Sequence, residues 1–335
     1  MNKPNIQLAS LLRLFPVPKT LSFSPVGIDI SHKAVRALKL KHSKEGLVPD
    51  TYKEVLLDEA CDLLESNDDL QKCESLRVSL RKLKQELDLK FVSVSLPETK
   101  TYIFKTSVPE EALETIEDAL SVKIQENVPL DSKDVIFDFQ IKTGKVMSDG
   151  QVEVVVTVLP KNVISAYTTL LEEEGMVPIF FESESQSITR SVIKEGDKTS
   201  YLLINLGYTK INLTIAEHGI VHYTSSLPFS SEEIIKDFNG KEAQALKTKI
   251  NQLLIYWFTN EHDPESNEQI SNALLTGPFA TAPGMVSFLE KGLRMNVGTA
   301  NVWKNCFDLD HHVPTIGHKA SLRYGTSIGL SLIYK

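Results

Sequence analysis

The sequence predicts an α/β protein of two related lobes, and three observations support this prediction. Short apolar segments rich in β-branched residues alternate with helical segments along most of the 335 residues. A pattern of strand, tight turn and strand that begins at residue 26 returns at residue 203. Hydrophobic residues make up 41% of the chain and charged residues 24%, which is ordinary for a globular protein long enough to bury two cores.

Hydrophobic spacing defines the elements of the first half of the chain. Leucines at helical spacing, with lysines and glutamates between them, predict an amphipathic helix over 68–89. Pro109 followed by two glutamates is typical of a helix start, and Gly175 is typical of a helix end. The other helices expected here are 109–126, 160–175 and 184–194. The expected strands are 26–30, 34–40, 91–96, 101–108, 135–142, 152–159 and 177–181.

The second half of the chain repeats this alternation. Three apolar segments separated by glycine-containing turns are expected as strands, over 201–206, 210–216 and 220–226. A long helical region is expected over 231–260, followed by a strand over 273–276 and a helix over 283–292. A final apolar helix is expected over 318–334.

Composition excludes several classes of protein. The net charge of −8 disfavours a nucleic-acid-binding role. Cys61, Cys73 and Cys306 lack metal-ligand spacing, so we expect three free thiols and neither a disulfide framework nor a zinc site. The sequence contains no run of about 18 apolar residues, so we expect no membrane span. Residues 1–24 are expected to form a loosely ordered extension with a short apolar helix over 8–15; the alternatives are an unstructured tail and a docking or membrane-surface anchor.

The repeated hairpin is the feature with the clearest functional meaning. Over 26–38, Asp29 near the end of an apolar strand precedes a polar turn; over 203–215, Asn205 precedes a similar turn. The backbone N–H groups of such turns can face a phosphate, and an aspartate at a strand end can hold a magnesium-bound water. The same pattern also describes an ordinary β-turn. A glycine turn before a helix at Gly277 adds a third part to the nucleotide-site interpretation.

At these residues the chain resembles a known family. The duplicated hairpin resembles the actin-like ATPase fold, which has two ribonuclease-H-like lobes, and the intervening segments resemble the PilM family of type IV pilus assembly and competence proteins. The segments that carry the second resemblance are 91–98, 106–109, 124–130, 154–163 and 188–190. The ending Tyr324-Gly325-Thr326-Ser327-Ile328-Gly329-Leu330 resembles the final helix of that family, so the resemblance covers about 25–335.

The resemblance implies a domain layout. The first lobe would combine 25–90, 176–198 and 317–335, and a small α/β subdomain over 91–175 would be inserted in it. The second lobe would cover 199–316.

The resemblance also implies a function. The protein would be a cytoplasmic scaffold, peripheral to the inner membrane, in type IV pilus assembly or a related competence or secretion system. ATP and Mg2+ would bind in the cleft between the lobes. The N-terminal cytoplasmic segment of a PilN-like inner-membrane protein would bind in a groove of the first lobe and its insert, and pilus motor components are further expected partners.

The sequence departs from the family at the nucleotide site. Asn205 stands where the family usually has aspartate, and Pro278 and Phe279 replace glycines of the adenosine loop. We therefore expect weak ATP binding and little or no hydrolysis, with an active ATPase as the alternative. The residues that the resemblance assigns to nucleotide are Asp29, Ser31, His32, Lys33, Asn205, Gly207, Tyr208, Thr209, Lys247, Gly277, Pro278 and Phe279, and Asp29 is also the expected metal residue.

The partner-binding surface is less clear from the sequence. By resemblance the candidates are Ile124, Val128, Pro129 and Leu130; the alternative is that they form the core-facing end of a helix. Two other classes remain as rivals. One is a cell-division actin homologue such as FtsA, which normally ends in a basic amphipathic helix. The other is the cytoplasmic part of a type II secretion platform protein.

Overall fold

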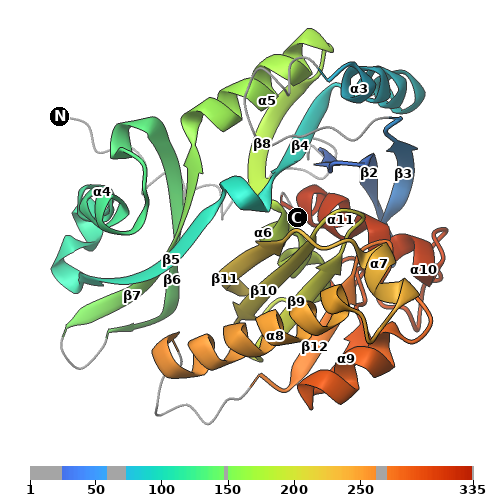
Figure 1. Cartoon of the computed structure of the whole chain (residues 1–335). Helices are drawn as coiled ribbons and strands as arrows, with labels where there is room; N and C mark the ends of the chain where they lie inside the picture. Colours follow the sequence, from blue (N-terminus) through green and yellow to red (C-terminus); the bar gives the residue numbers. More distant parts are fainter. Residues whose placement is uncertain (1–24, 59–72, 147–149, 262–269, 334–335) are drawn as a thin grey trace.

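The computed structural model describes residues 25–58, 73–146, 150–261 and 270–333 (Figure 1). Its first five-stranded sheet has the strand order β3-β2-β1-β4-β8, in which β1, β2 and β3 are antiparallel neighbours and β4 and β8 run parallel to β1. The strand bounds are β1 (Val26–Ile30), β2 (Ala34–Ser43), β3 (Gly46–Leu56), β4 (Phe91–Leu96) and β8 (Val177–Ser183).

The second sheet repeats this topology, so the prediction of two related lobes is confirmed. Its order is β11-β10-β9-β12-β13, with β9, β10 and β11 antiparallel and β12 and β13 parallel to β9. The strand bounds are β9 (Tyr201–Leu206), β10 (Ile211–Glu217), β11 (Ile220–Leu227), β12 (Asn272–Thr276) and β13 (Asn296–Thr299).

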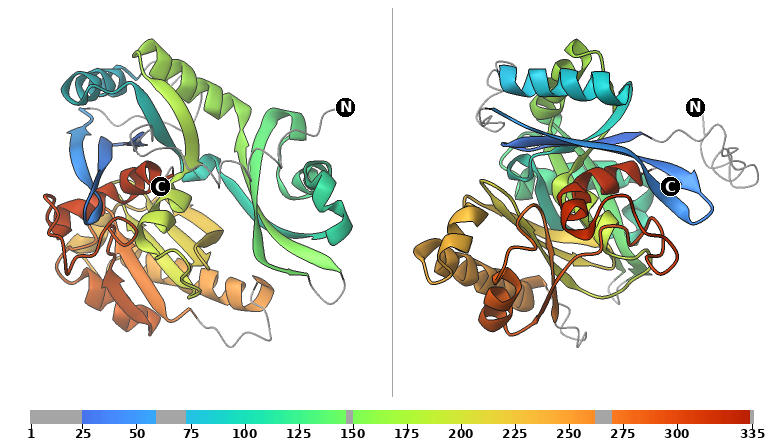
Figure 2. Two further views of the ribbon diagram at one scale, coloured as in Figure 1. Left: turned by 180° about the vertical axis from the view of Figure 1, so that it is seen from behind. Right: turned by 90° about the vertical axis from the view of Figure 1, so that its right-hand side faces the viewer.

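Helices cover both sheets. On the outer face of the first sheet, α3 (Glu74–Leu87) and α5 (Lys161–Glu173) share a core with β1 and β4. On the second sheet, α8 (Lys241–Tyr256) and α9 (Met285–Leu293) share a core with β9, β10 and β12. The short helix α7 (Ser231–Lys236) precedes α8 in the sequence. Figure 2 shows the C-terminal helix α11 (Gly325–Ser331) beside the first sheet, where it contacts α6 (Glu184–Val192), β1 and β2.

Two glycines permit the close packing of α11. A Cβ atom on Gly27 of β1 would lie 2.0 Å from the carbonyl oxygen of Ser327. A Cβ atom on Gly329 of α11 would lie 1.8 Å from the carbonyl oxygen of Ser187 in α6. Only glycine fits at either position, because real carbon atoms do not approach a carbonyl oxygen so closely.

A third, three-stranded antiparallel sheet projects to one side of the two lobes (Figure 2). It consists of β5 (Tyr102–Pro109), β7 (Gln151–Pro160) and β6 (Val135–Val146), packed against α4 (Ile116–Asn127) around a separate core. The third sheet and α4 together cover residues 102–160, a shorter part of the sequence than the expected insert over 91–175. At one end β4 pairs with β1, and at the other α5 packs on the first sheet, so the sequence boundaries were set too wide.

The structure also corrects several smaller expectations. The helical region 231–260 is broken between α7 and α8, where Gly240 lies just before α8, and it ends in a π-helical turn over Trp257–Glu261. The final helix begins as α10 (His318–Ser321) and is interrupted by a 3-10 turn over Leu322–Tyr324. The sequence interpretation missed β3, whose Pro49 lies near an irregularity in its pairing with β2.

The structure bears differently on the expectations about the N-terminal extension, the cysteines and membrane spans. Residues 1–24, Cys61 and the predicted start of the helix at 68 lie outside the described residues. Cys73 is disulfide-bonded, which corrects the expectation of three free thiols, whereas Cys306 is buried and is not part of a disulfide. Over the described part of the chain, no helix combines the length and apolar character needed to cross a membrane.

Candidate functional site

A polar cleft lies between the two sheets, at the carboxyl ends of β1, β9 and β12. Parallel strands of each sheet point their carboxyl ends at this cleft, which brings polar residues from distant parts of the chain together. Its free volume is about 80 Å3. The predicted residues that line it are Asp29, Ser31, His32, Lys33, Asn205, Gly207, Tyr208, Thr209, Gly277 and Pro278.

Two predicted residues do not line the cleft. Lys247 lies on α8, where its Nζ atom is 4.0 Å from the ring centre of Phe288. Phe279 contacts Tyr208 edge-to-face, with ring centres 5.1 Å apart, and packs against the core of the second lobe. Lys247 is therefore held by a cation–π contact instead of facing the cleft, and helix periodicity alone could not have shown this.

In each of the two hairpin turns, a backbone N–H group is hydrogen-bonded to a carbonyl oxygen of the same turn. The backbone N–H and the Oγ of Ser31 both donate to the carbonyl oxygen of Ala34, each at 2.9 Å. In the second turn the N–H of Gly207 donates to the carbonyl oxygen of Lys210 at 3.0 Å. The N–H groups at the start of both turns are thus already paired, and fewer remain to face an anion.

Gly277 fits the position that the sequence assigned to it. Its φ of +90° is in the left-handed region that favours glycine, and a Cβ atom there would lie 2.5 Å from the Oδ1 of Asn205. Its N–H donates to the carbonyl oxygen of Leu322 at 3.0 Å. The glycine turn of the second lobe is therefore tied to the C-terminal 3-10 turn.

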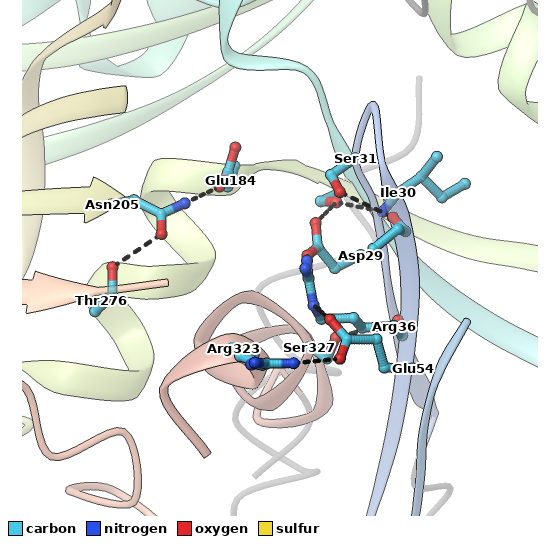
Figure 3. Close-up of polar contacts among 12 residues, drawn as sticks. Asp29, Ile30, Ser31, Arg36, Glu54, Glu184, Asn205, Thr276, Arg323 and Ser327 are labelled. Carbon is cyan, nitrogen blue, oxygen red and sulfur yellow. Dashed lines mark hydrogen bonds and ion pairs between the residues drawn. The ribbon is translucent and has the colours of Figure 1, made fainter. Parts of the chain in front are cut away.

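Asp29 is buried in an ion pair. Figure 3 shows its carboxylate facing Arg36, whose NH1 group lies 2.9 Å from Oδ2. The Oγ of Ser95 donates to Oδ1 at 3.1 Å. Burial raises the pKa of the Asp29 carboxyl, and the charge of Arg36 opposes that rise. Both carboxylate oxygens therefore already have protein partners.

The ion pair continues away from the cleft. The Nε of Arg36 donates to Glu54 of β3 at 2.8 Å, and the NH1 group of Arg323 in the C-terminal 3-10 turn donates to the other oxygen of Glu54 at 2.8 Å (Figure 3). The four side chains, Asp29, Arg36, Glu54 and Arg323, form what we term the ion-pair chain. It connects three adjacent strands of the first sheet to the C-terminal segment.

A second cluster lies across the cleft. Glu184, in the first turn of α6, accepts hydrogen bonds from the amide groups of Asn205 and, at 2.8 Å, Asn212. Thr276 donates to the Oδ1 of Asn205 at 3.3 Å (Figure 3). Burial, followed by the charges of Asp29 and Glu98, raises the pKa of Glu184 to about 8.

Glu98 is a further buried acid at the cleft. Its carboxylate accepts the backbone N–H of Ser185 at 3.0 Å and the Oγ of Ser185 at 2.8 Å, at the start of α6. Burial raises the pKa of the Glu98 carboxyl. The cleft thus contains two buried carboxyls, at Asp29 and Glu98, and the half-buried carboxyl of Glu184.

These residues do not fit a hydrated magnesium ion. Asp29 has both oxygens engaged, and Asn205 offers no carboxylate. Within the described ranges, no group of three or more His, Cys, Asp or Glu side chains is placed to hold a metal ion. The free volume is also below the roughly 300–1,000 Å3 typical of small-molecule sites.

Sequence reasoning missed Arg36, Glu54, Glu184 and Arg323. Arg36 lies on a strand that was judged only by its apolar residues, and Glu54 lies on β3, which the sequence interpretation missed. For Glu184 a clue existed, because an acid opens a helix directly after an expected strand. No local pattern could pair Glu54 with Arg323, which is far away in the sequence.

The candidate partner residues are mostly core. Ile124 and Val128 are buried against the third sheet, with exposed fractions of 0% and 5%, so the core-facing alternative holds for them. Pro129 is exposed and Leu130 is half-buried. An exposed apolar strip made of these four residues does not exist.

A larger hollow lies elsewhere, between α6, the third sheet and the β10–β11 turn. We call it the lateral groove, and its free volume is about 660 Å3. Its lining includes Gln140 of β6, Gln186 and Arg190 of α6, and His218 and Gly219 of the turn. It borders α6 and the third sheet, and the resemblance implies a groove of the first lobe and its insert.

Taken together, the duplicated sheets, the interlobe cleft and the extra three-stranded sheet define an actin-like α/β protein. The model of the family described as type IV pilus assembly protein PilM matches residues 27–261. This chain therefore belongs to the PilM family.

A solved structure of high overall similarity agrees with this fold. The structure is similar to one titled PilM-PilN type IV pilus biogenesis complex, with a TM-score of 0.74 and 15% identity over 93% of this chain and 99% of that one. The ethanolamine utilization protein EutJ from Carboxydothermus hydrogenoformans aligns with a TM-score of 0.49 and 12% identity over 97% of each chain. The cytoplasmic domain of EpsL from Vibrio cholerae aligns with a TM-score of 0.46 and 11% identity, over 75% of this chain and 80% of that one. No curated protein matches the sequence.

Proposed function

We propose that this protein is a cytoplasmic actin-like scaffold of type IV pilus assembly, or of a related competence or secretion system. It acts at the inner membrane by binding the N-terminal cytoplasmic segment of a PilN-like membrane protein. The observation that carries the proposal is the PilM-PilN match, which extends over 93% of this chain in addition to the family match. Pilus motor components are further partners under this proposal, and family membership favours it over a cell-division actin homologue.

We propose that nucleotide binding is weak or lost. The actin-like ATPase fold is in general a nucleotide-binding fold, but three features of this cleft oppose that use. Asp29 is paired with Arg36, Asn205 replaces a carboxylate, and Pro278 lacks the N–H that a glycine would offer. An ATP-binding switch remains the second candidate, because Ser31, Lys33 and Gly207 keep their places at the cleft.

Calorimetry with Mg-ATP on the full chain distinguishes these two candidates. The scaffold proposal expects a dissociation constant of about 1 mM or weaker, which corresponds to about 4 kcal/mol of binding free energy. Micromolar binding or steady turnover of ATP would favour the switch. Neither result affects the partner proposal, which is measured separately.

We propose that the lateral groove receives the PilN-like segment. The groove borders α6 and the third sheet. Its lining includes amide and basic side chains, which suit an extended peptide backbone, together with Glu195 and three apolar residues, Ile193, Val221 and Leu332. The test is the affinity of a synthetic peptide of that segment for wild-type protein and for Gln140→Trp, which would fill the groove. We expect at least a tenfold loss, about 1.4 kcal/mol.

The matched control is Gln252→Trp, at an exposed glutamine on α8, which should bind the peptide like the wild type. Equal affinity of the two variants would place the peptide elsewhere on the protein. Loss of binding in both variants would indicate a general effect of the added tryptophan.

A further inference from the structure

Arg36 is the buried cation of the cleft. Among the residues that the structure describes, it is the only Lys or Arg side chain in the buried class, with 4% of the residue exposed. Charged side chains are rarely buried unless paired, because removing them from water costs several kcal/mol. The pairing of Arg36 with Asp29 on one side and Glu54 on the other explains how it is tolerated.

The position of Arg36 gives this burial a functional meaning. Its guanidinium faces Asp29, the carboxylate that the sequence marked as the metal residue, and carries the positive charge that a metal ion would otherwise supply. A guanidinium presents several N–H donors in a fixed plane, so it can serve two carboxylates at once. Unlike a metal ion, it cannot dissociate.

We propose that the guanidinium of Arg36 is a built-in replacement for the divalent cation, and that it makes the cleft independent of metal. This inference rests on the proposal that nucleotide binding is weak or lost. It goes beyond that proposal by naming the group that has taken the place of the metal.

The ion-pair chain extends the same device to the second lobe. Arg36 binds Glu54, and Glu54 binds Arg323 in the C-terminal 3-10 turn. The preceding residue, Leu322, accepts the N–H of Gly277 at 3.0 Å. One short turn therefore connects the first sheet to the glycine turn of the second lobe, and the two sides of the cleft are joined by the protein's own groups.

The test is the response of thermal unfolding to Mg2+, compared with EDTA, for the full chain. The wild type should show no shift in its unfolding midpoint. Arg36→Met leaves Asp29 and Glu54 without their shared cation, so its midpoint should fall. Mg2+ should raise the midpoint of Arg36→Met by about 2–4 °C, because a metal that binds only the folded state stabilises it.

Two further variants keep the test decisive if Arg36→Met folds poorly. Asp29→Asn/Arg36→Met removes both charges of the pair; it should unfold at a higher temperature than Arg36→Met and should show no Mg2+ shift. Asp29→Asn alone leaves Arg36 paired with Glu54 and should also lack a Mg2+ shift.

Two results would overturn the proposal. One is a Mg2+ shift in the wild type that disappears in Asp29→Asn, because the metal would then bind beside Arg36. The other is the absence of a Mg2+ shift in Arg36→Met, or, if that variant does not fold, a double variant no more stable than it. These results are distinguishable from failure of the proposed function, because peptide binding and ATP calorimetry on the wild type do not depend on them.

Discussion

Glu184 and Asn212 are hydrogen-bonded at 2.8 Å, and this contact joins the start of α6 to strand β10 of the second sheet. The same carboxyl also accepts the amide of Asn205. One half-buried acid therefore connects the helix between the sheets to both strands of the second hairpin. This arrangement and the ion-pair chain lead to the first two of the predictions below, and the packing of α11 and of α4 leads to the other two.

The first prediction concerns pH. The pKa of Glu184 is about 8 in the folded protein, against 4.5 for the ordinary side chain, so the folded state keeps this proton longer than the unfolded chain does. Its contribution to stability is therefore fully present below about pH 4.5 and is lost as the pH rises through about 8, by at most about 1.4 kcal/mol per pH unit. Glu184→Gln cannot ionise and should show a shallower decline. Denaturant unfolding from pH 5 to 8 measures both, and parallel curves would contradict the assignment.

The second prediction concerns Asn205. Asn205→Asp places a carboxylate beside Glu184, where the amide now donates, so we expect a loss of about 1–2 kcal/mol in the free energy of unfolding at pH 8. The loss should shrink at pH 6, where Glu184 is protonated. Mg2+ should not rescue the variant, because Arg36 still holds Asp29. A variant as stable as the wild type at both pH values would show that the Glu184–Asn205 contact contributes little.

The third prediction concerns the packing of α11. Gly329→Ala would bring a Cβ atom against the Ser187 carbonyl, so we expect a loss of about 3 kcal/mol or more in the free energy of unfolding. Gly298→Ala is the control, because no atom lies within 4 Å of the added carbon. Its effect should stay within about 1 kcal/mol. Equal effects of the two substitutions would indicate that α11 adjusts without cost.

The fourth prediction concerns α4 and the third sheet. Val128→Asp places an unpaired charge in the core, with Val128 only 5% exposed, so it should disrupt the third sheet. Val122→Asp, at a 57% exposed position on helix α4, which ends directly before Val128, should fold normally and bind the PilN-like peptide like the wild type. Limited proteolysis measures the first effect and peptide affinity the second. Loss of binding in a folded Val122→Asp variant would return the partner surface to α4.

The sequence by itself predicted much of this protein. Apolar periodicity and a repeated turn pattern predicted most strands and both related lobes, because these features are local or nearly so. The family was indicated by the resemblance of the segments between the two hairpins. The same pattern placed Asp29, Asn205 and Gly277 together at one cleft, since strands of equivalent topology end at the same edge. The sequence-based boundaries of the third sheet's subdomain and of the interrupted helices differ from the observed ones, because the ends of elements carry weak local sequence signals.

Only the tertiary structure decided what the cleft contains. Glu54 and Arg323 are 269 residues apart in the sequence, and no rule of sequence spacing connects two such residues. Whether Asp29 faces a metal or Arg36 depends on which side chains the folded sheet brings within about 3 Å, and on the cost of leaving either charge unpaired away from water. In the same way, only packing showed that Val128 and Ile124 are core and that Lys247 lies against Phe288.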